Sequence, residues 1–335
     1  MKKVVVTGAS GHIGANLVRE LLERGYPVVA LVRQTSLALE GLSVERVHGD
    51  LSDIQSLRKA FRGAEMVYHL AAFISIQSGD REKLESVNVE GTRNVIAACH
   101  AEAVSTLIHF SSIHALEQLS PDQEITENNP LIDGRQGGGG DYEVSKARAE
   151  KLVREINSEF LSTRIIYPTA VLGPNDFNHS LFGQVILKMA QGRLPALVSG
   201  GYNWVDARDV AWGAVEAAEK GMNGGRYILS GHYLSMTGVA AIIEALTGVP
   251  APRFVVPTWL AVACAPLMGV WARINRENPI YTRESVAAVA AKPRISHSRA
   301  TKMLAYQPRG FQNSMRDTLL YYSQQTGKPL ISAGG

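Results

Sequence analysis

The sequence is poor in cysteine and in net charge, and each shortage excludes a class of protein. Its 335 residues include two cysteines, Cys99 and Cys264, which are too few for a disulfide framework. No spacing of His, Cys, Asp and Glu predicts a metal site, and the formal net charge of +3 is too small to indicate a nucleic-acid partner. The first residues carry no signal-peptide pattern, so a reducing, cytoplasmic location is expected.

Short apolar runs alternate with amphipathic stretches through the first half of the chain. Runs rich in β-branched residues predict strands that are buried on both faces, and the helical spacing between them predicts crossover helices. The alternation predicts an α/β fold built on a doubly wound, Rossmann-type parallel sheet of about seven strands. The predicted strands in this half are residues 3–7, 28–33, 44–48, 66–70, 106–111 and 163–167.

The pattern loosens after residue 170, where Gly173–Asp176 is typical of a loop. We expect a Rossmann domain over residues 1–170 and a smaller, mainly C-terminal lobe over residues 171–335. Helical spacing at 205–219 and a strand-like run at 226–229 predict that about 203–230 returns to the first domain.

A glycine-rich turn follows the first predicted strand, with Gly8, Gly11 and Gly14 in the order Gly-x-x-Gly-x-x-Gly. The first glycine permits a tight turn, the second lets a pyrophosphate approach the backbone, and the third lets helix and strand pack closely. The helix N-terminus then offers free N–H groups to the phosphates. The turn predicts a dinucleotide cofactor, held by Gly8, Ser10, Gly11, His12, Ile13 and Gly14.

The end of the second predicted strand indicates which dinucleotide is bound. An acidic residue there would bind the ribose 2′-hydroxyl of NAD, but the strand ends Val32-Arg33-Gln34 without one. The Arg33 guanidinium suits a 2′-phosphate. NADP(H) is therefore favoured, with NAD(H) as the alternative, and residues 1–170 are expected to form an NADP-binding domain.

Tyr142 and Lys146 lie four residues apart, which places them on one face of a helix. A nearby ammonium stabilises a phenolate and lowers the pKa of the tyrosine, which can then exchange a proton with a substrate hydroxyl or carbonyl. The run 106–111 ends at a serine pair, Ser111 and Ser112, whose hydroxyls would lie at the carboxyl edge of the sheet, where ligands bind. Such a hydroxyl can hold the reacting oxygen.

These motifs resemble the short-chain dehydrogenase/reductase superfamily, in particular its extended branch. The resemblance covers essentially the whole chain, with specific motifs over 1–175, and it implies that Ser112 rather than Ser111 is catalytic, with Tyr142 and Lys146. Asp50 is also compatible with a cap for a helix over 53–62, and Asn88 with holding a helix or a proton-relay water. The resemblance implies further cofactor contacts from Asp50, Leu51, Leu70, Ala71, Ala72, Asn88, Tyr142, Lys146, Tyr167, Pro168 and Thr169.

Within that branch, the chain is most similar to enzymes like dihydroflavonol reductase and 3β-hydroxysteroid dehydrogenase. Dehydratases of the branch carry an acidic pair after the catalytic Ser or Thr, whereas Ile113 and His114 follow Ser112 here. The segments expected beside the substrate are apolar, which favours an aryl, terpenoid or steroid-like carbonyl or alcohol. The candidate substrate contacts are Phe73, Ile74, Ile113, His114, Phe177 and Phe182, and the expected activity is that of an NADP-dependent oxidoreductase.

Two alternatives remain open. Much of the chain, including residues 88–94 and 201–211, also resembles bacterial proteins described as hopanoid-associated sugar epimerases, which keeps an NAD-dependent nucleotide-sugar epimerase as an alternative. A non-catalytic NADP-sensing regulator would be expected to have lost Tyr142 or Lys146, and both are present.

Two further segments carry expectations of their own. The glycine run at 136–140 is compatible with a mobile lid over the substrate or with a plain surface loop. Residues 251–335 hold 11 Lys and Arg against 3 Asp and Glu, a net charge of +8, and include an uncharged run at 254–272. We expect this run to form buried helices of the lobe; a weak membrane-surface contact through 254–276 is the alternative, and a homodimer is left open.

Overall fold

A computed structural model describes residues 3–75, 79–118, 123–134, 139–263, 289 and 294–332. Residues 136–138 of the predicted lid lie outside the described residues. So do Cys264 and the rest of the 254–276 run beyond residue 263.

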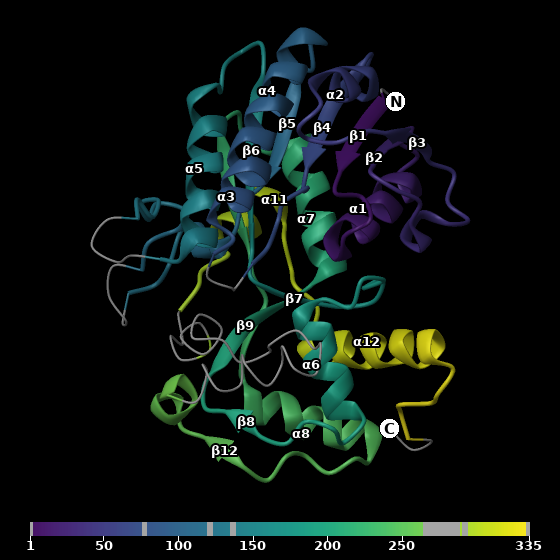
Figure 1. Ribbon diagram of the computed structural model, residues 1–335, viewed down its shortest axis with the longest axis vertical. Helices are drawn as coiled ribbons and strands as arrows, with labels where there is room; N and C mark the ends of the chain where they lie inside the picture. Colours follow the sequence, from purple (N-terminus) through teal and green to yellow (C-terminus); the bar gives the residue numbers. More distant parts are fainter. Residues whose placement is uncertain are drawn as a thin grey trace.

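A seven-stranded parallel sheet forms the upper half of the molecule in Figure 1, and it confirms the predicted fold class. Its order is β10-β6-β5-β4-β1-β2-β3, with every neighbouring pair parallel. The order reverses beside β1, because β2 lies on one side of it and β4 on the other. The strands are β1 Lys3–Thr7, β2 Val28–Val32, β3 Glu45–His48, β4 Ala64–His69, β5 Thr106–Phe110, β6 Ser162–Pro168 and β10 Gly225–Leu229.

Helices cover both faces of this sheet because alternate side chains of each strand point to opposite faces. Val4 and Val6 of β1 pack in one apolar cluster with α1 (His12–Glu23), α7 (Ala207–Lys220) and α11 (Ser298–Leu304). Val5 packs in a second cluster with the helices of the other face. Those helices are α2 Ile54–Phe61, α4 Gly91–Ala101, which the short α3 Arg81–Leu84 and a π-helical turn Glu85–Glu90 precede, and α5 Asp141–Glu155.

The first helix, α1, begins at His12, with Gly11 at its N-cap. One local expectation in this half needs adjustment. The cap of α2 is Asp53, whose carboxylate accepts a hydrogen bond from the Gln55 N–H at 2.9 Å. The reading of Asp50 as that cap is therefore wrong, because its carboxylate accepts instead from the Ser52 N–H at 2.9 Å.

The lower half of Figure 1 is a smaller lobe with its own apolar cluster. Strands β7 (Ala170–Leu172), β9 (Gly201–Asp206) and β11 (His232–Ser235) form a three-stranded sheet, and β8 (Leu197–Val198) pairs with β12 (Val255–Val256). The buried residues of this cluster come mainly from these strands and from the helices around them. Each of these elements thereby buries its apolar face against the others. The helices are α6 Leu181–Ala190, α8 Met236–Thr247 and α12 Phe311–Thr326.

The chain passes between the two halves more than once. After β9 it returns to the main sheet as α7 and β10, and after the lobe it returns again as α11, which packs against α7. Arg208 at the start of α7 joins the halves, because it pairs with Asp206 and, at 2.7 Å, with Asp317 of α12.

The start of the uncharged run is partly exposed, contrary to expectation. Phe254 and Trp259 are 74% and 72% exposed, and Val255 and Leu260 are also exposed, whereas Ala261 is buried. The prediction of buried helices is therefore wrong for these four side chains. In the part of the chain that is described, we find no helix with the length and apolarity needed to cross a membrane.

Candidate active site

A cleft of about 1580 Å³ runs along the carboxyl ends of the main-sheet strands and continues into the lobe. Its upper wall comes from the glycine turn and from the segments after β2, β3, β4 and β5. Its lower wall comes from α6, β8 and β9. It lies at the point where the strand order reverses, which is where open parallel sheets bind ligands.

The glycine turn has the geometry that a bound pyrophosphate needs. Gly8 has φ +73°, and a Cβ there would lie 2.6 Å from the Ala71 nitrogen. A Cβ on Gly14 would lie 2.1 Å from the Gly8 carbonyl oxygen. The first turn of α1 has no side-chain cap and no acidic residue. Its free N–H groups therefore fit a phosphate, and the chain's residues fit a nicotinamide dinucleotide.

The loop after β7 is tied to this turn. The His12 ring Nε2 lies 3.1 Å from the Gly173 carbonyl oxygen, and the Asn178 side-chain amide donates to the Ser10 carbonyl oxygen at 2.9 Å. His12 lines the cleft as predicted, but its ring nitrogen is turned toward the lobe loop. Its role is thus to join the glycine turn to the loop 173–178.

Arg33, Asp50 and Leu51 lie together at the far end of the cleft, after β2 and β3. Arg33 is exposed. Hydrogen bonds from the Ser52 backbone and hydroxyl lower the pKa of Asp50, and the positive charge of Arg33 adds to this. The predicted cation for a 2′-phosphate is therefore free to reach a ligand, although an anionic carboxylate lies near it.

Ser112, Tyr142 and Lys146 converge in the middle of the cleft. Tyr142 lies in the first turn of α5, and Lys146, which is buried, donates through Nζ to the Phe110 carbonyl oxygen at 2.6 Å. The Ser112 hydroxyl oxygen accepts from the His114 N–H at 3.2 Å, and the same hydroxyl lowers the pKa of Tyr142. The Ser111 hydroxyl donates instead to the Glu150 carboxylate at 2.5 Å. The geometry therefore favours Ser112 over Ser111 as the hydroxyl available to substrate.

Burial dominates the proton affinities of this group. Desolvation raises the pKa of Tyr142 to about 12, while the Ser112 hydroxyl lowers it. Desolvation lowers the pKa of Lys146 to about 8, and the Glu150 carboxylate opposes that fall. Burial thus keeps the proton on Tyr142 at neutral pH, in contrast to the expectation that Lys146 lowers its pKa.

Three predicted site residues do not line the cleft. Asn88 is buried, its Oδ1 accepts from the Phe73 N–H at 2.7 Å, and its Nδ2 donates to the Ser145 hydroxyl at 2.9 Å. It thus holds the segment after β4 against α5, which fits the holding role. Tyr167 is also buried, and its hydroxyl donates to Glu150.

Phe177 lies away from the substrate side. Its ring meets the Tyr321 ring edge-on, with centroids 5.7 Å apart, and the Arg19 guanidinium lies 5.5 Å from its centroid. Phe177 therefore packs between α1 and α12, a placement that the sequence could not indicate because both partners are distant in the chain.

The lobe end of the cleft is an apolar chamber. Phe73, Ile74, Ile113 and Phe182 line it as predicted, together with the exposed His114. Phe182 also stacks edge-on with Tyr202 and Trp204, with ring centroids 4.9 Å away in both cases. Sequence reasoning missed most of the chamber, since its apolar residues come from many short segments without a shared motif. They include Ile125, Ile132, Leu181, Val185, Leu194, Leu197, Val198, Tyr202, Met236, Val289 and Ile295.

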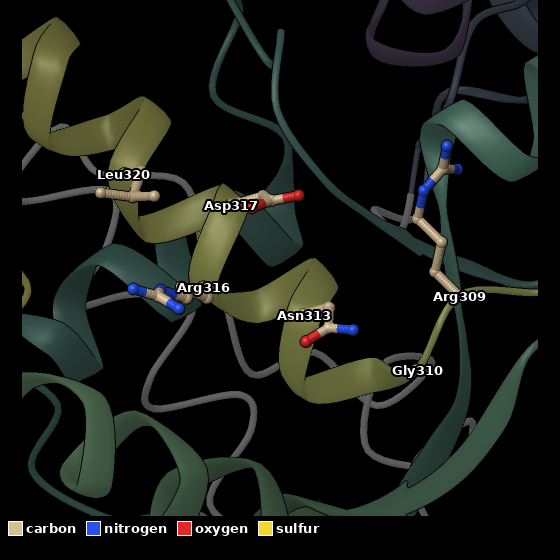
Figure 2. A pocket seen from close by; sticks show the side chains of 6 residues that line it. All are labelled: Arg309, Gly310, Asn313, Arg316, Asp317 and Leu320. Carbon is tan, nitrogen blue, oxygen red and sulfur yellow. The ribbon is translucent and has the colours of Figure 1, made fainter. Parts of the chain in front are cut away.

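A second, smaller hollow lies at the start of α12 and holds no predicted site residue (Figure 2). In Figure 2 the guanidinium of Arg309 points away from Arg316. Arg309 pairs with Asp209 of α7, and Asp317 pairs with Arg208. This hollow is thus part of the junction between the lobe and the main sheet.

Comparison with known proteins identifies the family of the chain. The model of the family described as "NAD dependent epimerase/dehydratase family" matches residues 4–230. The chain is 37% identical over 325 residues to "Sterol demethylase protein B" of Methylococcus capsulatus, covering 96% of this chain and 98% of that protein. It is 32% identical over 334 residues to a "Putative dihydroflavonol 4-reductase" of Synechocystis, covering 95% and 93%.

A solved structure, that of the protein gox2253, superposes with a TM-score of 0.84 at 32% identity, covering 98% of this chain and all of that one. The family match spans more than half of the chain, and it includes the glycine turn and the Ser112, Tyr142 and Lys146 positions. The chain therefore belongs to the NAD dependent epimerase/dehydratase family, as an NAD(P)-dependent oxidoreductase of the extended short-chain dehydrogenase/reductase type.

Proposed function

We propose that this enzyme is an NADP-dependent oxidoreductase that transfers hydride between the nicotinamide and a carbonyl or secondary alcohol of an apolar substrate. The observation that carries the proposal is the position of Ser112, Tyr142 and Lys146. They lie where the cofactor half of the cleft, marked by the glycine turn, meets the apolar chamber.

Each of the three side chains has a role in carbonyl reduction. A nicotinamide cofactor held by the glycine turn would supply the hydride for the carbonyl carbon. Tyr142, which holds its proton because its pKa is raised to about 12, donates that proton to the carbonyl oxygen. The Ser112 hydroxyl orients this oxygen. The Lys146 ammonium stabilises the phenolate that is left, which regains its proton from solvent; oxidation of an alcohol runs through the same groups in reverse.

The choice of NADP(H) rests on Arg33, which is exposed at the end of β2 within the cleft. Its guanidinium can bind a 2′-phosphate through two hydrogen bonds. The Asp50 carboxylate is close enough to Arg33 to interact with its charge, and a carboxylate there favours NAD(H). The test must therefore distinguish NADP(H) from NAD(H).

The apolar chamber supports the proposed substrate class over a nucleotide-sugar. A sugar diphosphate is dianionic or more and would call for cations beside it. Among the described residues that line the cleft, the Lys and Arg side chains are Arg33, Lys83 and Lys146, and the first and last lie in the cofactor half. The Lys83 ammonium lies 4.0 Å from the centre of the Phe73 ring. The names of the sterol demethylase protein and dihydroflavonol reductase relatives point in the same direction.

The test is NADPH oxidation with a panel of aryl, terpenoid and steroid ketones, beside a Tyr142→Phe variant. We expect turnover of at least one class, and a loss on the order of 100-fold to 10,000-fold in the variant with NADPH binding retained. Conversion of a UDP-sugar without net cofactor oxidation would instead support an epimerase. NADPH binding without turnover of any carbonyl or alcohol would support a sensing regulator.

A further inference from the structure

Glu150 is a fully buried carboxylate inside the catalytic helix, with 0% of its surface exposed. It lies one turn after Lys146 on α5. Its Oε2 accepts from the Ser111 hydroxyl at 2.5 Å, and its Oε1 accepts from the Arg154 Nε at 2.8 Å and from the Tyr167 hydroxyl. A buried carboxylate is costly unless it is paired and hydrogen-bonded, and this one is both.

The partners of Glu150 adjoin separate parts of the site. Ser111 directly precedes Ser112 at the end of β5, and its N–H donates to the Ile166 carbonyl oxygen at 2.9 Å. Tyr167 directly precedes Pro168 and Thr169, which line the cleft. One carboxylate therefore connects the ends of β5 and β6 to the helix that carries Tyr142 and Lys146.

Glu150 also determines the charge balance around Lys146. The titratable groups that interact with the Lys146 charge are Glu150 on α5, His109 on β5 and His69 on β4; Tyr142 lies four residues before Lys146 on the same helix. Burial lowers the pKa of both histidines, and the Lys146 charge lowers them further, so both rings are neutral at neutral pH. Among these groups, the negative charge thus comes from Glu150.

We propose that Glu150 is a positioning residue for the Ser112, Tyr142 and Lys146 site, where it aligns the ends of β5 and β6 with α5 and supplies the counter-charge that keeps Lys146 cationic. The inference rests on the proposed function of that site. It adds a charge requirement that the three catalytic side chains do not meet by themselves.

The test is the pH profile of NADPH oxidation in Glu150→Gln, which keeps the size of the side chain and removes its charge. In the wild-type enzyme, deprotonation of Lys146 should produce a falling limb above about pH 8. We expect the limb to move down by roughly one pH unit in the variant, and to stay in place in Glu155→Gln, which removes an exposed carboxylate from the same helix. An unmoved limb in a slower Glu150→Gln enzyme would reduce Glu150 to a structural contact and overturn the proposal.

A second variant keeps the proposal testable if Glu150→Gln does not fold. Arg154 is partly exposed and neutralises Glu150 from outside. Arg154→Gln should therefore strengthen the negative field at Lys146 and move the limb to higher pH. A limb that stays in place or moves to lower pH would contradict the proposed counter-charge.

The pH dependence of NADPH binding, followed by nicotinamide fluorescence, separates this inference from the proposed function. Suppose that no ketone or alcohol is turned over, but the pH at the midpoint of the change in NADPH affinity differs between the wild type and either variant. The proposed function then fails and the role of Glu150 stands. If turnover occurs and neither midpoint shifts, the proposed function stands and the role of Glu150 fails.

Discussion

Replacement of Lys146 by methionine should make the folded protein more stable at neutral pH while it abolishes function. Lys146 is buried, and its pKa falls from 10.5 to about 8 in the folded state. The difference of 10.5 minus 8 is 2.5 pH units, which corresponds to about 3.4 kcal/mol of unfavourable free energy at pH 7. Methionine fills a similar space without a charge, so this penalty disappears in the variant.

One loss offsets part of that gain. The Phe110 carbonyl oxygen loses the donor that Lys146 provides at 2.6 Å, which costs about 1 kcal/mol. Glu150 keeps its hydrogen bonds from Ser111, Arg154 and Tyr167. We therefore expect Lys146→Met to raise the free energy of unfolding by about 2 kcal/mol at pH 7.

The pH dependence has a definite sign. Between pH 8 and 10.5 the unfolded chain holds the Lys146 proton and the folded chain does not, so the stability of the wild type rises with pH in that window. At pH 9.5 a difference of 1 unit remains, about 1.4 kcal/mol. The advantage of Lys146→Met should thus shrink by about 2 kcal/mol between pH 7 and pH 9.5.

The assay is urea denaturation at both pH values. The matched control is Lys151→Met, which replaces a lysine with 71% of its side chain exposed on the same helix and should change stability by less than about 0.5 kcal/mol at either pH. A Lys146→Met variant that is less stable than wild type at pH 7, or a difference that does not change with pH, would refute the reasoning.

Three further predictions follow from the cofactor site and the lobe surface. Gly14→Ala places a Cβ 2.1 Å from the Gly8 carbonyl oxygen, so NADPH affinity should fall more than about tenfold in a fluorescence titration. Arg33→Ala should weaken NADPH binding by roughly 10-fold to 100-fold and leave NADH binding nearly unchanged in the same titration. Phe254 and Trp259 are exposed beside the wall of the apolar chamber, and we propose that they contact anionic lipid surfaces; replacing both with serine should abolish co-sedimentation with anionic vesicles at low salt.

Each of these has a control within the chain. Gly310→Ala adds a Cβ that meets no atom within 4 Å, so it should leave NADPH affinity intact. A similar loss of NADPH affinity in both glycine variants would contradict the role of the glycine turn in cofactor binding. Equal losses for NADPH and NADH in Arg33→Ala would remove the case for a 2′-phosphate contact. Phe160, which is 89% exposed on the main domain, is the control for the lipid surface. A wild-type protein that does not sediment with vesicles would contradict the lipid contact. So would a dimer, detected by size-exclusion chromatography, in which Trp259 is buried.

The sequence predicted what depends on neighbouring residues. Strand β1 falls on the run Lys3–Thr7 and β10 close to 226–229, because a strand buried on both faces shows itself as a continuous apolar run. The proposed catalytic pair, Tyr142 and Lys146, is predictable for the same reason, since residues four apart share a helix face.

What the sequence could not show depends on where distant segments meet. Glu150 lies four residues after Lys146 on the same helix face, but its charge is typical of a surface residue, and only the approach of Ser111 and Tyr167 reveals that it is buried. The sequence predicts that Phe177 contacts substrate, whereas in the structure its ring packs against Tyr321 of α12. The apolar chamber is likewise formed by single apolar residues from many segments, so no local sequence pattern predicts it.

The ties between the glycine turn and the loop after β7 link cofactor binding to the lobe. His12 of the turn contacts the loop, and Asn178 of the loop contacts the turn. The same loop is bound to α12, because the Tyr322 hydroxyl donates to Asp176 at 2.7 Å. A cofactor that orders the glycine turn therefore acts on a segment fixed to the substrate lobe. By thermodynamic reciprocity, any gain in substrate affinity caused by the cofactor must be matched by an equal gain in cofactor affinity caused by the substrate.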